Sequence, residues 1–87
     1  IMLDLVLASG DRIGLNYAYM NLAQLTSDGV LTLEFTSARV IITGRGLLTL
    51  YNNILTHHAY RIEASATPFD DNSSEVWVKS LVVEEKE

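Results

Sequence analysis

The sequence contains no cysteine, a single proline and two lysines, and each scarcity narrows what the protein can be. Without cysteine, disulfides, thiolate zinc sites and cysteine nucleophiles are excluded together. Eighty-seven residues, 48% of them hydrophobic, make one small domain over residues 1–87, near the size at which a single core is only just sufficient. Small domains without covalent cross-links often gain stability by associating with copies of themselves. We therefore expect a homo-oligomer.

Long hydrophobic runs are also missing. No apolar stretch approaches the roughly 18–20 residues that a bilayer-spanning helix needs. Asp4 interrupts the apolar N-terminal segment, which has neither a basic region nor a small-residue cleavage site and therefore does not resemble a signal peptide. We expect a cytoplasmic protein with no membrane partner.

Positive charge is scarce, because six basic residues stand against eleven acidic ones and the net charge is −5. Residues 70–87 carry −4 of this charge, so the preceding part of the chain is nearly neutral. All four basic residues of that preceding part are arginines, which are suited to bidentate contacts with phosphate or carboxylate. The balance argues against a strongly basic nucleic-acid binder and leaves a local binding patch open.

Alternation of apolar and polar side chains predicts strands along most of the chain. The predicted strands are residues 2–7, 12–19, 30–36, 39–43, 60–64 and 75–84. In the second of them, Tyr17 and Tyr19 share a face. After Gly46 the apolar period becomes helical and predicts about three turns over residues 47–58, and a polar loop follows at residues 67–74. The pattern predicts a mainly β domain, in which an antiparallel meander forms a small bent sheet or barrel of about five to six strands with one helix.

No pattern in the sequence points to catalysis or to metal binding. The two histidines, His57 and His58, are adjacent, so on a helix they point about 100° apart and do not share a metal. The serines lie mostly in turns, outside any nucleophile-elbow pattern. Adjacent carboxylates at 70–71 and 84–85 fall in a loop and a tail, without the burial that acid–base catalysis requires. We expect a non-enzymatic protein with no metal and no cofactor.

Two short segments are the candidates for a binding site. Gly44-Arg45-Gly46 places an arginine and backbone N–H groups at the predicted strand-to-helix junction, where an anion is favoured. The alternative there is an ordinary turn with a solvated arginine. Residues 17–22 combine tyrosines, which stack on bases, with Asn21, which can read a base edge. Here the alternative is that the tyrosines are half-buried sheet residues.

Taken together, the two segments resemble motifs of the Sm/LSm small β-barrels, a family of ring-forming RNA-binding proteins. Gly14-Leu15 followed by Met20-Asn21-Leu22 is similar to the first family motif, and the apolar strand that ends in Arg45-Gly46 is similar to the second. The resemblance covers about residues 3–50 and is that of a divergent member, of a kind found in phages and marine microbes.

The resemblance implies an Sm-like barrel whose two motifs line a ring pore and hold a nucleobase and its phosphate. The residues that would do so are Tyr19, Met20, Asn21, Arg45 and Gly46. Repetition around a ring would concentrate the positive charge that a single acidic chain lacks.

The sequence therefore favours a non-enzymatic Sm-like ring of roughly five to seven subunits that binds single-stranded RNA or DNA. We expect the subunit interface at the last strand, on Trp77 and Val83, or on Val76, Val78 and Val82 if that strand faces the other way. The alternative is a structural or protein-interaction oligomer with no nucleic-acid role, which the acidic balance favours.

Overall fold

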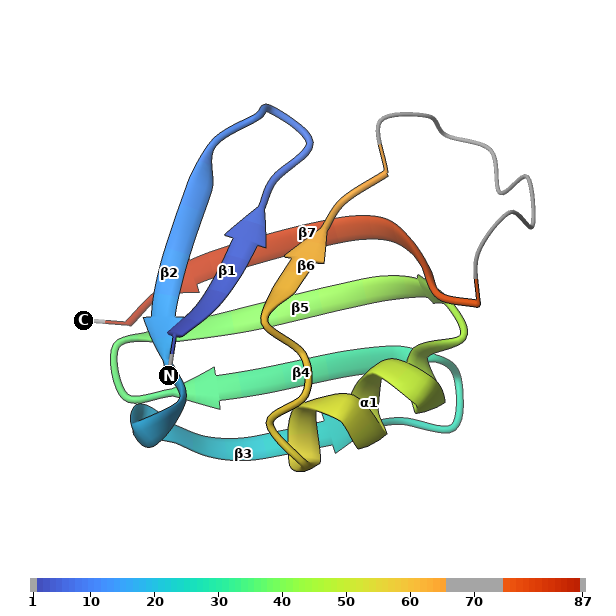
Figure 1. Ribbon diagram of the computed structural model, residues 1–87, viewed down its shortest axis with the longest axis horizontal. Helices are drawn as coiled ribbons and strands as arrows, with labels where there is room; N and C mark the ends of the chain where they lie inside the picture. The colour runs from blue at the N-terminus through green and yellow to red at the C-terminus, as the bar shows by residue number, and fades with distance from the viewer. Residues whose placement is uncertain (1, 66–74, 87) are drawn as a thin grey trace.

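Strands dominate the structure, a computed structural model that describes residues 2–65 and 75–86 (Figure 1). In chain order the elements are β1 (Met2–Val6), β2 (Arg12–Asn16), the 3-10 turn η1 (Tyr17–Tyr19), β3 (Met20–Leu25), β4 (Val30–Phe35), β5 (Ala38–Arg45), α1 (Leu47–Leu55), β6 (Arg61–Glu63) and β7 (Trp77–Glu85). The predicted fold class, a small mainly β domain with one helix, is confirmed. The loop predicted at residues 67–74 lies outside the described residues.

The strands form two sheets, one of three strands in the order β2-β1-β6 and one of four in the order β3-β4-β5-β7. The three-stranded sheet and α1 lie on the same face of the four-stranded sheet (Figure 1). A hydrogen bond from Ser65 N–H to the carbonyl of Val78 (2.9 Å) joins the end of β6 to β7. The predicted antiparallel pairing is confirmed for β1 with β2 and for β4 with β5 but is wrong for β6, which pairs in parallel with β1.

The core fills the space between the two sheets and α1. β4 shows how the sequence dictates it, because Leu31, Leu33 and Phe35 are buried while the residues between them are only partly covered. The fully buried large side chains are Phe35, Leu3, Leu5, Leu31, Leu33, Ile42, Ile54 and Val40. Each contributes about 1.5–3 kcal/mol of burial free energy, so these strands and α1 are fixed relative to one another.

The helix begins where predicted and ends early. Gly46 precedes it with a left-handed backbone (φ 71°), and Leu47, Leu50 and Ile54 point into the core. The predicted extension to residue 58 is wrong. The backbone of His57 has φ 59°, and a left-handed residue ends a helix because it turns the chain out of the helical path.

A strand that the sequence pattern did not reveal, β3, follows η1. The predicted strand at 12–19 breaks at Asn16, whose side-chain oxygen accepts a hydrogen bond from Ala18 N–H (2.9 Å) and starts the 3-10 turn. The turn rotates successive side chains by about 120° rather than 180°. Tyr17 is therefore 5% exposed and Tyr19 60% exposed, and the prediction that they share a face is wrong.

Candidate functional site

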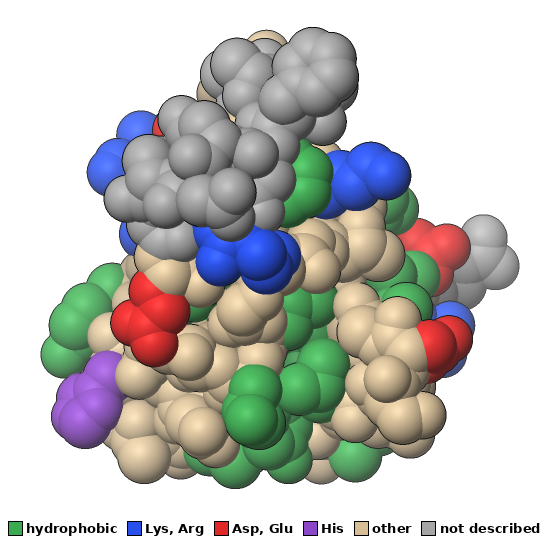
Figure 2. All heavy atoms as spheres, turned by 90° about the vertical axis from the view of Figure 1, so that its right-hand side faces the viewer, with side chains coloured by type: hydrophobic (Ala, Val, Ile, Leu, Met, Phe, Trp, Pro, Cys, Tyr) green, Lys and Arg blue, Asp and Glu red, His purple; other side chains and the backbone are tan. Residues whose placement is uncertain are grey.

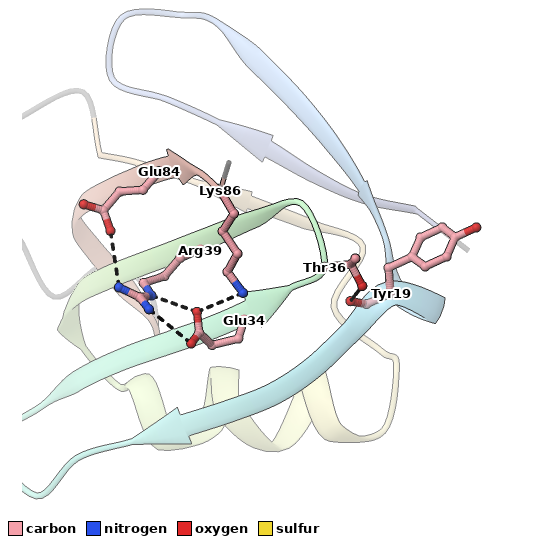
Figure 3. Close-up of polar contacts among 6 residues, drawn as sticks. All are labelled: Tyr19, Glu34, Thr36, Arg39, Glu84 and Lys86. Carbon is pink, nitrogen blue, oxygen red and sulfur yellow. Dashed lines mark hydrogen bonds and ion pairs between the residues drawn. The ribbon is translucent and has the colours of Figure 1, made fainter.

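The first group of predicted site residues surrounds the junction between η1 and β3. Tyr19 is exposed, and its carbonyl accepts hydrogen bonds from the N–H (2.9 Å) and the hydroxyl (3.4 Å) of Thr36 (Figure 3). Met20 is half-buried and packs against the core. Asn21 is exposed at the point where the pairing of β3 with β4 shifts register. These residues form a solvent-accessible corner of the domain.

The second group, Arg45 and Gly46, lies elsewhere. Both β3 and β5 pair antiparallel with β4 and therefore run in the same direction. The start of β3 and the end of β5 are consequently at opposite ends of the four-stranded sheet (Figure 1). A single chain does not bring the two groups together, so the five-residue nucleic-acid site stays a prediction.

Gly44-Arg45-Gly46 is a tightly packed joint between the end of β5 and the start of β7. A Cβ atom at Gly46 would overlap the carbonyl oxygen of Glu75, and one at Gly44 would overlap that of Trp77. The guanidinium of Arg45 donates a hydrogen bond from Nη1 to the Glu75 carbonyl (3.2 Å). The two glycines therefore allow two backbone segments to approach each other, which gives this motif a structural role of its own.

Three basic side chains lie around the first half of β7. Arg45 is the register partner of Trp77, and Lys79 lies at the neighbouring β-bulge, where the pairing of β5 with β7 shifts. Arg61 lines a hollow of about 230 Å³ beside β7, and its Nε is 3.9 Å from a carboxylate oxygen of Glu63. Figure 2 shows Lys and Arg side chains around the upper half of the molecular face that it displays. The grouping places three basic side chains near one strand, together with the carboxylates of Glu63 and Glu75.

The bulge also determines which side chains of β7 point toward the core. Val78 is buried and Val83 packs half-buried against the core, whereas Val82 is 49% exposed on the other face. Trp77 is half-buried, and its indole nitrogen is buried with no hydrogen-bond partner among the described residues. Nothing in the arrangement tests the predicted interface at Trp77 and Val83, which stays a prediction.

An apolar recess lies between β2, the start of β5 and the end of β7. This space, which we call the β2 groove, has a volume of about 430 Å³ and opens to solvent. Its lining residues are Ile13, Leu15, Ser37, Ala38, Val83, Glu85 and Lys86. Ile13 and Leu15 come from β2 and Val83 from β7, so residues about 70 positions apart in the chain face one another across it.

One edge of β2 borders this groove. In the described part of the chain β2 has a single strand neighbour, β1, and Asp4 of β1 is the register partner of Gly14. The N–H of Asp4 donates to the carbonyl of Tyr60 on the β6 side (2.8 Å). In an antiparallel ladder, two directly opposite residues either both direct their N–H and C=O groups toward each other or both direct them away. The N–H and C=O of Gly14 therefore face away from β1, on what we call the open edge of β2.

Of the two charged residues that line the groove, Lys86 takes part in an ion pair in the described part of the chain and Glu85 does not. Lys86 Nζ lies 3.4 Å from a carboxylate oxygen of Glu34, and Arg39 Nε donates to the same carboxylate (2.7 Å; Figure 3). These contacts, with Arg39 the dominant one, hold the pKa of Glu34 below its ordinary value. Glu84 lies 4.0 Å from Arg39, whereas Glu85 forms no ion pair within residues 2–65 and 75–86. Glu85 thus gives the rim an uncompensated negative charge.

Several titratable groups among the described residues take part in contacts that hold the fold together. A hydrogen bond from Arg12 lowers the pKa of Asp4, and burial raises the pKa of Tyr17, whose hydroxyl donates to the carbonyl of Ala59. The ring of His57 packs against that of Tyr17 with centroids 4.7 Å apart. Among the described residues, no group of three His, Asp or Glu side chains is placed to hold a metal ion.

Fold and groove together define a small mainly β domain with an open strand edge beside an apolar recess. No protein-family model, curated protein or solved structure matches this chain. Over the residues that the structure describes, no helix has the length and hydropathy to span a bilayer. Sequence reasoning missed the groove, because its walls come from residues of β2 and β7 that lie about 70 positions apart in the chain.

Proposed function

We propose that this chain is a non-enzymatic protein-interaction domain that binds an extended segment of a partner protein along the open edge of β2. The observation that carries the proposal is the juxtaposition of that edge with the β2 groove of about 430 Å³. An unpaired strand edge supplies backbone donors and acceptors, and an apolar recess beside it supplies a pocket for side chains. Together they are the two requirements for binding by strand addition.

The backbone of β2 supplies the affinity. Arg12, Gly14 and Asn16 share the orientation deduced for Gly14, because alternate residues of a strand direct their N–H and C=O groups to the same side. An added strand would satisfy these groups. Every second side chain of that strand would point into the groove, against Leu15 and Val83. Partners with small or medium apolar residues at alternate positions are the best fit.

The rim selects the charge of the partner. Glu85 lines the groove without a cationic partner in the described part of the chain, while Lys86 is engaged by Glu34. A lysine or arginine in the bound segment would therefore meet an available carboxylate. The proposed ligand is an extended polypeptide with alternating apolar residues and at least one basic residue.

Binding of single-stranded RNA or DNA is the second candidate, and one observation favours it. Arg45, Lys79 and Arg61 gather around the first half of β7, beside the only tryptophan. Cations with a neighbouring aromatic ring are the usual components of a single-strand surface. Retention on an oligonucleotide column at low salt, lost as salt rises and reduced by Arg45→Ala, would support this candidate. Free passage through the column at low salt would contradict it.

The strand-addition proposal is tested with a displayed library of random peptides, since the natural partner is unidentified. We expect enrichment of peptides that alternate apolar residues and carry a basic residue. A selected peptide, synthesised alone, should then bind the purified protein in a calorimetric titration. Glu85→Lys should weaken binding of a peptide with a basic residue and leave binding of a neutral analogue almost unchanged.

Gly14 provides a matched pair of variants. Gly14→Pro removes the N–H that faces the open edge without removing a donor to β1, and proline is tolerated at such edge positions. Gly14→Ala keeps the N–H, and its Cβ would meet only the end of the Met2 side chain at 3.4 Å. We expect Gly14→Pro to weaken peptide binding by about tenfold or more, which corresponds to about 1.4 kcal/mol, and Gly14→Ala to bind normally. No enriched peptide, or equal binding by the two variants, would contradict the proposal.

A further inference from the structure

We propose that a second copy of this chain docks on the surface formed by β3 and α1, giving a two-fold symmetric dimer. This inference is independent of the β2 groove. Charge is unevenly distributed along the chain: 20% of the residues are charged, and yet residues 13–27 and 46–60 contain no Asp, Glu, Lys or Arg. The first stretch includes β3 and the second includes α1. Since α1 packs against β3, the fold places the two uncharged stretches together (Figure 1).

This uncharged surface also carries most of the exposed large hydrophobic side chains. The described part of the chain exposes seven such side chains, and five of them belong to the two stretches. Those five are Tyr19, Leu22, Leu48, Leu55 and Tyr60. Leu22 is the register partner of Glu34 and therefore lies on the face of the sheet away from α1, so it is not part of the surface beside the helix. Figure 2 shows hydrophobic side chains towards the lower part of the face, well away from most Lys and Arg side chains. Depletion of charge combined with exposed aromatic and aliphatic residues is the composition of an interface core.

The edge of β3 is open and unprotected. Among the described strands it pairs with β4 only. Natural edge strands are usually protected by charge, proline or a short length, but residues 20–25 contain neither a charge nor a proline. The N–H of Thr26 donates to the carbonyl of Val30 (2.9 Å), so by alternation Ala23 and Leu25 turn their backbone groups away from β4. A second strand can pair there.

Beside this edge, α1 supplies a hydrophobic stripe. Leu48, Tyr51 and Leu55 are spaced three and four residues apart and therefore share one side of the helix. Leu48 is 62% and Leu55 52% exposed, while the core-facing side of the helix is occupied by other residues. The stripe is more apolar than a solvent-facing helix side needs to be.

A second copy is the occupant that fits both features. An isologous dimer requires a self-complementary surface, and a surface without charge meets its own copy without burying an unpaired ion. A two-fold axis normal to the sheet would pair β3 with its counterpart antiparallel and join the two four-stranded sheets into one. Because α1 lies over β3 and β4 on one face of that sheet (Figure 1), the two helices would lie side by side over the junction and pack their stripes together.

The first test is the molar mass in solution by light scattering coupled to size exclusion, over a range of concentrations. We expect twice the chain mass of 9.7 kDa. Leu48→Glu should reduce the mass to that of one chain, because it places two like charges in the proposed interface. A glutamate in the first turn of a helix is favourable to folding, so circular dichroism and thermal unfolding should show an intact fold. The matched control is Val82→Glu, at a position 49% exposed on β7, which should leave the dimer unchanged.

Cysteine cross-linking locates the interface directly, since the chain has no cysteine of its own. Gln24→Cys, on the exposed face of β3, should cross-link between copies with a short bismaleimide, and Val82→Cys should not. A monomer at all concentrations would overturn the proposal, and so would a mass of five or more chains. A dimer that persists in Leu48→Glu, or that cross-links through position 82 rather than 24, would also overturn it.

Discussion

Gly46→Ala tests most sharply how the end of β5 is built. Gly46 has a left-handed backbone (φ 71°), and an alanine held in that conformation would destabilise the folded state by about 1–2 kcal/mol. In addition, the new Cβ would overlap the backbone carbonyl of Glu75, which cannot rotate away as a side chain would. The start of β7 must therefore move away from α1.

That movement would disrupt two further contacts. Arg45 Nη1 donates to the Glu75 carbonyl (3.2 Å), and the hydroxyl of Thr49 donates to a carboxylate oxygen of Glu75 (3.1 Å). With about 1 kcal/mol for each hydrogen bond, the expected loss in the free energy of unfolding is about 3–4 kcal/mol. Domains of this size lose about 4–8 °C of Tm per kcal/mol, so Tm should fall by roughly 12–32 °C.

Gly29→Ala is the matched control. Gly29 also has a left-handed backbone (φ 87°), but a Cβ added there meets no atom within 4 Å. Only the conformational term of about 1–2 kcal/mol remains. Urea and thermal unfolding of both variants, followed by the fluorescence of Trp77, separate the two terms. Equal destabilisation by the two substitutions would refute the conclusion that Gly44-Arg45-Gly46 is a packed joint.

Three further predictions concern the core, a buried hydroxyl and an ion-pair cluster. Leu33→Ala, at a fully buried position, should lower the free energy of unfolding in urea by about 3–4 kcal/mol, whereas Val82→Ala should change it by less than about 1 kcal/mol; similar effects would contradict the packing. Tyr17→Phe should lower it by about 1 kcal/mol because the Ala59 carbonyl loses its donor, and an unchanged value would exclude that bond. The pKa of Glu34 is lowered in the folded state, so its contribution to stability is present above the ordinary pKa of 4.5 and is lost as the pH falls through the lower folded pKa. Glu34→Gln should therefore flatten the decline of Tm below about pH 4.5. An unchanged decline would contradict the pairing with Arg39.

The strands with strict alternation were predictable from the sequence. β4 follows the pattern residue by residue, because its polar positions face out and its apolar ones face the core. The start of the helix was equally predictable, since Leu47, Leu50 and Ile54 repeat at helical spacing. In these elements local pattern and tertiary packing demand the same structure, which is why the pattern is sufficient.

Other elements required information that local pattern does not contain. The break at η1 depends on one side-chain hydrogen bond from Ala18 to Asn16, and β3 lies just beyond it. The parallel pairing of β1 with β6 joins segments nearly 60 residues apart. Gly44-Arg45-Gly46 was interpreted as a candidate anion site, but its glycines are required by the backbone of Glu75 and Trp77, which no spacing along the chain indicates.

In the candidate sites, too, some features can be read from the sequence and others depend on the fold. The uncharged stretches at 13–27 and 46–60 can be read directly from the sequence, but only the fold reveals that they adjoin. The β2 groove depends on the placement of Leu15 against Val83 across two sheets. The Sm-like resemblance and the site carried over from it stay predictions, and within one chain their two motifs lie at opposite ends of a sheet.

Amide hydrogen exchange along β2, measured by NMR on the free protein and on its complex with a selected peptide, tests the central claim most directly. The account predicts fast exchange at Gly14 and slow exchange at Ile13 and Leu15 in the free protein, because only the latter two donate towards β1. Adding the peptide should slow exchange at Gly14. Protection of Gly14 in the free protein, or its continued fast exchange in the complex, would contradict binding by strand addition at this edge.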